Sequence, residues 1–184
     1  MTGCNNNENR DVPVENTTQI LSTKETPKVK KILTHTFTLS DNRAKSYTVT
    51  TIKQDIIFPN IKEKIVLINF LSSSDSPAFA EVPYLSMLQK DYNQTLFVMS
   101  ILLNDSNQSD SIKRLEEKKP THFISHSKEN GAFFSQVLKN LYLTSNIATP
   151  LSVLYKEGKY MSHYKGAVPL EMLRHEVKQL LKNK

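Results

Sequence analysis

The side chains best suited to chemistry in this sequence are one cysteine and five histidines. Cys4 is beside the N-terminus, so the chain cannot form an internal disulfide, a Cys-ligated zinc site, or any site that needs two thiols. His122 and His126 are four residues apart, which would place both on one face of a helix. Their segment has the pattern of a strand followed by a loop, however, so we expect no metal site. The other three histidines lie within strand or helix patterns, where packing or exposure explains them: His35, His163 and His175.

The composition indicates one ordinary globular domain with a tail. The chain has 184 residues, with 24 Lys and Arg against 18 Asp and Glu, and a formal charge of +6. Its 38% hydrophobic content and four glycines exclude collagen-like and Gly/Ser-linker sequences. The most apolar run, Leu96 to Leu103, is far shorter than the roughly 18 residues that a membrane-spanning helix needs. The positive charge is dispersed and the chain has no Trp, so we expect no nucleic-acid partner. Because no phosphate-binding loop, nucleophile elbow or HExxH motif occurs, we also expect no cofactor.

Residues 1–30 differ from the rest of the chain. They are rich in polar residues and have too little apolar surface to offset the entropy of ordering, which predicts a flexible tether. Residues 31–184 then show alternating strand and helix patterns, which predict a single α/β domain.

The patterns of residues 31–184 follow the order β-β-β-α-β-α-β-α-β-β-α. The run Ile65-Val66-Leu67-Ile68-Asn69-Phe70 is apolar almost throughout, as expected of a central strand covered on both faces. The predicted strand regions are 33–39, 47–58, 65–70, 96–103, 122–124, 151–155 and 160–164. The predicted helices carry apolar residues at helical spacing over 79–88, 109–119, 132–141 and from Pro169 onward.

Three local motifs accompany this order. Residues 66–70 run into Glu81-Val82-Pro83-Tyr84-Leu85, Ala148-Thr149-Pro150 precedes a strand, and the closing hairpin is followed by Gly166 and a helix. Together they resemble the thioredoxin fold in its TlpA/ResA-like, membrane-anchored branch, over about residues 33–182. The resemblance implies a thioredoxin-like three-layer sandwich, with a central mixed sheet, helices on both faces and an N-terminal strand extension.

The chain departs from this family at the position that defines it. Aligned on residues 70 and 81–83, the family's Cys-x-x-Cys pair falls on Asp75-Ser76-Pro77-Ala78, and Ser74 and Leu71 replace two usual tryptophans. Thiol–disulfide exchange needs an attacking thiolate and a second, resolving thiol, which a carboxylate and a methyl group cannot supply. Asp75 or Ser76 as a helix N-cap, with Pro77 at the first helical position, accounts for the segment without any catalytic role.

The second family feature is a cis-proline loop. In the family, the residue before this proline offers its backbone to an extended peptide, and Thr149 with Pro150 would inherit that role by position. The alternative is that Pro150 only shapes the loop. If the groove survives, it would lie near Ser74, Asp75, Ser76, Thr149 and Pro150.

The N-terminus suggests where the protein resides. Thr2-Gly3-Cys4 resembles the end of a bacterial lipobox, in which the cysteine is acylated, and a polar tether after it suits a lipid anchor. A chain without other cysteines agrees with an oxidising compartment. Asn93 and Asn107 each lie in a D/E-x-N-x-S/T pattern that resembles bacterial periplasmic N-glycosylation sites, and both are expected in exposed loops. We therefore expect a periplasmic protein anchored by lipid to a bacterial membrane.

Three functional hypotheses follow. The favoured one is a redox-inactive module that binds or scaffolds a periplasmic protein or peptide. The second is an accessory role in a thiol:disulfide exchange or cytochrome-maturation pathway. An enzyme that uses a mechanism without thiols in the same groove is the third.

Overall fold

The computed structural model describes residues 33–72, 76–103 and 108–182. The described part contains eight strands and four helices. The strands are β1 (Thr34–Ser40), β2 (Ser46–Ile52), β3 (Asp55–Ile57), β4 (Ile65–Ser72), β5 (Leu96–Leu103), β6 (Phe123–Ser125), β7 (Leu151–Lys156) and β8 (Lys159–Lys165). The helices are α1 (Ser76–Asp91), α2 (Gln108–Glu117), α3 (Asn130–Asn140) and α4 (Leu170–Lys182).

A five-stranded mixed sheet forms the centre of the domain, in the order β6-β5-β4-β7-β8. β4 is parallel to β5, β5 is parallel to β6, and the hairpin β7–β8 adds two antiparallel strands beside β4. β4 and β5 are buried along nearly their whole length, because helices or strands cover both of their faces. The central position predicted for the run 65–70 is therefore confirmed.

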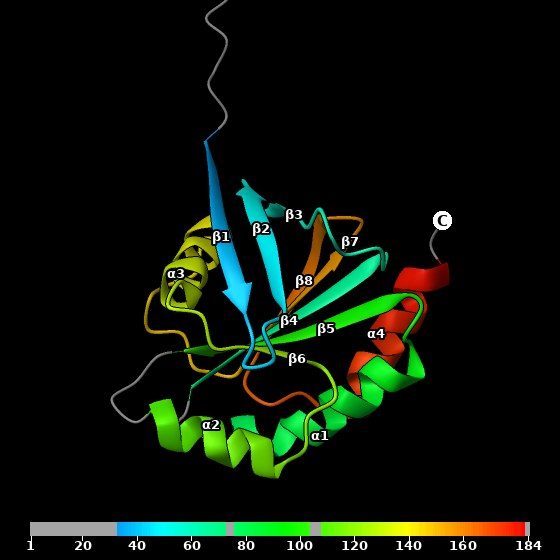
Figure 1. Ribbon diagram of the computed structural model, residues 1–184. Helices are drawn as coiled ribbons and strands as arrows, with labels where there is room; N and C mark the ends of the chain where they lie inside the picture. The colour runs from blue at the N-terminus through cyan, green and yellow to red at the C-terminus, as the bar shows by residue number, and fades with distance from the viewer. Residues whose placement is uncertain (1–32, 73–75, 104–107, 183–184) are drawn as a thin grey trace, which may run out of the picture. The chain divides into compact units, whose positions relative to one another are not determined.

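Alternate residues of β4 enter two separate cores. Ile65 and Leu67 pack with apolar residues of α1 and α4, whereas Ile68 and Phe70 pack with α3 and with the small sheet of β1–β3. A third cluster joins α2 to α1 and to the ends of β4 and β5. Figure 1 shows α1 and α4 on one side of the central sheet and α3 with β1 and β2 on the other. The predicted α/β three-layer sandwich is thus present.

The N-terminal strands form their own antiparallel sheet, β1-β2-β3, instead of extending the central one. The single strand region predicted over 47–58 is wrong in this detail, because Lys53 adopts a left-handed backbone conformation (φ 55°) and turns the chain between β2 and β3. β3 then contacts the hairpin turn, where the Ile56 amide donates to the Gly158 carbonyl at 2.8 Å.

None of the helices within the described residues is long and apolar enough to cross a membrane.

Candidate functional site

The segment that replaces the family's Cys-x-x-Cys pair leads into α1. Ser76, Pro77 and Ala78 form the first turn of α1, which begins four residues after β4 ends at Ser72. Ser74 and Asp75 lie outside the described residues. The first helical turn therefore starts at the carboxyl end of the central strand, where loops of parallel sheets commonly carry binding sites.

The proline loop lies at the same end of the sheet. The Thr149–Pro150 peptide bond is cis, as the resemblance implies. Pro150 is buried, and its carbonyl accepts a hydrogen bond of 2.7 Å from the Gly166 amide. The next residue, Leu151, pairs with Phe70 near the end of β4. The register of β7 on β4 therefore brings the proline loop to the strand end from which the chain enters α1.

A buried polar cluster lies beneath α1. The Asn69 side-chain amide donates to Ser152 Oγ at 3.0 Å and to a Glu81 carboxylate oxygen at 3.3 Å. The other Glu81 oxygen accepts the backbone N–H of Val168, in the loop before α4. Glu81 thus joins α1, β4 and the loop after β8 into one unit. Sequence patterns placed Asn69 and Glu81 in family motifs, but they gave no indication that Ser152 would meet them.

Burial dominates the electrostatics of Glu81. Its side chain is only 6% exposed, and desolvation raises the pKa of its carboxyl, although the two hydrogen bonds oppose this effect. Asn69 Oδ1 is also buried and has no hydrogen-bond partner among the described residues. The cluster is therefore polar, buried and fixed in place by backbone and side-chain donors.

An open groove of about 470 Å³ runs over this cluster, between α1 and the start of α4. Its lining is mainly apolar, with Glu81 at its buried side: Ala80, Glu81, Tyr84, Ala167, Val168, Pro169, Leu170 and Glu171. Tyr84 is 53% exposed, and Met87, one turn further along α1, is 45% exposed, so this helix presents large apolar side chains to the surface. The groove is suited to apolar side chains of an extended ligand.

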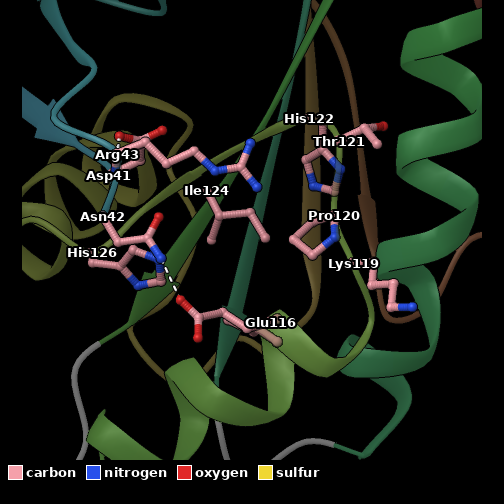
Figure 2. A pocket seen from close by; sticks show the side chains of 11 residues that line it. Asp41, Asn42, Arg43, Glu116, Lys119, Pro120, Thr121, His122, Ile124 and His126 are labelled. Atoms are coloured by element: carbon pink, nitrogen blue, oxygen red, sulfur yellow. Dashed lines mark hydrogen bonds between the residues drawn. The ribbon is translucent and has the colours of Figure 1, made fainter.

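The two histidines singled out in the sequence lie on either side of β6 and line one cavity (Figure 2). His122 is buried between two hydroxyls, with Nδ1 2.8 Å from Ser86 Oγ and Nε2 2.9 Å from Ser100 Oγ. Burial lowers the pKa of His122 to about 4, and it lowers the pKa of His126 as well. Within residues 33–72, 76–103 and 108–182, no group of three His, Cys, Asp or Glu side chains could hold a metal ion.

The remaining predicted residues are either exposed or outside the description. Asn93 is exposed in the turn between α1 and β5. Cys4 and Asn107 lie outside the described residues. Acylation of Cys4 and glycosylation of either asparagine stay predictions.

Comparison with known proteins places the fold. No family profile matches the sequence, and no curated protein matches it. Three solved structures cover most of the domain. A thiol:disulfide interchange protein DsbE from Chlorobium tepidum has a TM-score of 0.58 and 19% identity, over 80% of this chain and 94% of that one. StoA from Bacillus subtilis has a TM-score of 0.55 and 18% identity, over 77% and 95% of the two chains.

The third is the exposed lipoprotein thioredoxin Etrx1 from Streptococcus pneumoniae. It has a TM-score of 0.59 and 14% identity, over 79% of this chain and 99% of that one. These similarities, with the strand order and the cis-proline loop, define a thioredoxin-like fold.

Proposed function

We propose that this protein is a redox-inactive thioredoxin-like module that binds an extended polypeptide in the groove between α1 and the start of α4, beside the proline loop. The observation that carries the proposal is that the thioredoxin-like fold keeps an open apolar groove in a chain whose one cysteine, Cys4, is not in the segment 75–78. The cis Thr149–Pro150 bond and the start of α1 lie at the end of one strand. The apolar groove opens beside them, and neither Thr149 nor Pro150 lines it. Without a second thiol, that site can bind a polypeptide but cannot exchange disulfides with it.

The groove determines the kind of polypeptide that fits. Tyr84, Pro169 and Leu170 provide apolar surface, and the Glu81 carboxyl is buried and bonded to Asn69 and to the Val168 amide. We therefore propose a partner segment that is extended and presents apolar side chains, with affinity from buried apolar surface rather than from ion pairs.

The N-terminal motif is the basis for a proposal about where the protein resides. We propose that acylated Cys4 anchors the domain to a bacterial membrane on its periplasmic side. A Cys4→Ser variant should be recovered in the soluble fraction, and mass spectrometry of the wild-type chain should show a diacyl or triacyl adduct on Cys4. An unmodified Cys4 in membrane-free extract would refute the anchor.

Binding can be tested with a pair of helix-surface variants. Ala80 lies in the groove, and Ala132 is an exposed residue on α3 outside it. Ala80→Arg should fill the groove and weaken binding of short unstructured peptides rich in apolar residues by about tenfold or more, measured by fluorescence anisotropy. Ala132→Arg adds the same charge elsewhere and should leave binding unchanged. Equal effects of the two variants would refute binding in the groove.

An accessory role in a thiol:disulfide pathway is the second candidate. It is favoured by the solved structures of the same fold, since two of those compared above are a thiol:disulfide interchange protein and a lipoprotein thioredoxin by name. Insulin reduction by Cys4→Ser protein should not exceed background under either candidate. Cross-linked partners with paired cysteines would favour the accessory role, and partners without them would favour a scaffolding role.

A further inference from the structure

A second cavity, of about 550 Å³, lies beyond the edge strand β6 of the central sheet (Figure 2). It is built from the turn between β1 and β2, the end of α2 and the chain on both sides of β6. None of these segments contributes to the groove described above. Its lining comprises Asp41, Asn42, Arg43, Leu115, Glu116, Lys119, Pro120, Thr121, His122, Ile124 and His126.

The acidic groups of this cavity are already occupied. Asp41 Oδ1 accepts the backbone N–H groups of Arg43 and Lys45, both at 2.8 Å, and so holds the turn in shape. A Glu116 carboxylate oxygen accepts a hydrogen bond from the side-chain amide of Asn42, as Figure 2 shows. Both ring nitrogens of His122 are bonded to serine hydroxyls. Each of these groups therefore already has a partner within the protein.

The donors are not. Within the described residues, the Arg43 guanidinium and the Lys119 ammonium form no ion pair and no side-chain hydrogen bond. Figure 2 shows the Arg43 side chain extending across the cavity, above Ile124 and toward His122. His126 Nδ1 is buried and has no hydrogen-bond partner among the described residues. The cavity thus offers two unpaired cationic donors, and an imidazole nitrogen without a partner, to a ligand that carries acceptors.

The floor of the cavity is apolar. Ile124 is 5% exposed and Leu115 is 1% exposed, and Pro120 lines the wall beside them. A guanidinium beside an apolar floor suits a ligand with a planar oxyanion and a short aliphatic part. The carboxylates of Asp41 and Glu116 balance the charges of Arg43 and Lys119 in the wall, so the cavity has no excess positive charge to hold a polyanion and suits at most a monoanion that pairs directly with the guanidinium.

We propose that this cavity binds a small aliphatic carboxylate, whose oxygens pair with the Arg43 guanidinium while its apolar part lies on Ile124. Lys119 adds positive charge at the opposite wall. The carboxylate can belong to a free small molecule or to the C-terminus of a peptide. The site uses none of the residues of the polypeptide groove, so either site can be absent without the other.

The test is a titration of the isotope-labelled full chain, monitored by NMR. The ligands are butyrate, inorganic phosphate, and an acetylated apolar tripeptide in two forms, one with a free C-terminus and one with an amidated C-terminus. Butyrate should cause saturable shifts at the Arg43 side-chain Nε–H and the His126 ring, with a Kd on the order of 1 mM. Tighter binding of the free-carboxylate tripeptide than of butyrate would identify a chain terminus as the ligand, and the reverse would identify a free metabolite. Binding of the amidated tripeptide with equal affinity, or of phosphate more tightly than butyrate, would overturn the proposal.

Variants separate a built site from general charge attraction. Arg43→Gln should weaken butyrate binding by about tenfold or more, and Arg43→Lys should restore only part of it, because an ammonium cannot pair with both oxygens at once. Lys165→Gln removes the same charge from an exposed position on β8 and should change nothing. Because the Arg43 side chain is exposed and unpaired, these variants should keep the native amide spectrum. Linear, non-saturating shifts, or equal losses in Arg43→Gln and Lys165→Gln, would refute the site.

Discussion

Acidification should destabilise this protein through His122. The imidazole is 6% exposed and lies between Ser86 and Ser100, where neutral hydroxyls can bond it but no carboxylate can stabilise its charged form. Desolvation therefore lowers its pKa from 6.5 to about 4 in the folded state. In the unfolded chain the ring takes up a proton near its ordinary pKa, so the unfolded state binds more protons between these two values.

The sign and size of the effect follow from this difference. Stability contributed by neutral His122 is fully present above about pH 6.5 and is lost as the pH falls toward about 4. A pKa shift of this size contributes about 3 kcal/mol at most to the free energy of unfolding, and roughly 2 kcal/mol of that contribution should be lost by pH 4.5.

The assay is urea unfolding at pH 7.5 and at pH 4.5, for the wild type and for His122→Gln. The Gln side chain keeps one donor and one acceptor but does not titrate, so His122→Gln should be less stable than wild type at pH 7.5 and should lose less stability on acidification. Other groups, such as Glu81 and His126, titrate in both proteins and cancel in the comparison. His175→Gln, at an exposed position on α4, serves as the control and should follow the wild type. Parallel pH profiles for wild type and His122→Gln would refute the reasoning.

Three further predictions concern the fold and the buried cluster. Gly158 has φ +79°, and a Cβ there would lie 2.4 Å from the Ile56 carbonyl oxygen. Gly158→Ala should therefore lower the free energy of unfolding by about 1–3 kcal/mol in urea unfolding. Gly131 has open space around it, so Gly131→Ala should not lower the free energy of unfolding. Phe133→Ala removes a fully buried ring from the core between α3 and the sheet, and should cost about 3–5 kcal/mol in urea unfolding. Burial raises the pKa of Glu81, so the stability of the wild type should fall as the pH rises through that raised value. Calorimetry should show that the stability of Glu81→Gln depends less on pH over the same range.

Local patterns in the sequence were sufficient to predict most of the elements. The apolar run 65–70 is the central strand, and the two strands separated by Lys156 to Lys159 form the hairpin. The turn between β2 and β3 was missed because its signal is a left-handed Lys53, a residue type that does not favour this conformation. Glycine or asparagine at that position would have marked the break.

The candidate sites were harder to predict, because their residues meet only through tertiary structure. Ser86 and Ser100 bond His122 from positions 36 and 22 residues away, and nothing local distinguishes them from other serines. The cavity beside β6 likewise depends on Arg43, in the β1–β2 turn, lying across from the end of α2. Such contacts are fixed by how the three-stranded sheet packs on the domain, which periodicity cannot specify.

The strand registers place the polar groups under α1 in one continuous row. Asn69 on β4 is the register partner of Ser152 on β7 and of Ser100 on β5, and Ser100 bonds His122. Buried polar groups of this kind rarely stabilise a core more than apolar residues of similar volume would, and Asn69 Oδ1 remains without a partner within the described residues. Packing alone therefore does not explain a polar row beneath the first helix of a thioredoxin-like domain that has no thiol pair. A row that holds α1 and the loop before α4 in fixed positions beside an open apolar groove supports the binding role proposed for that groove.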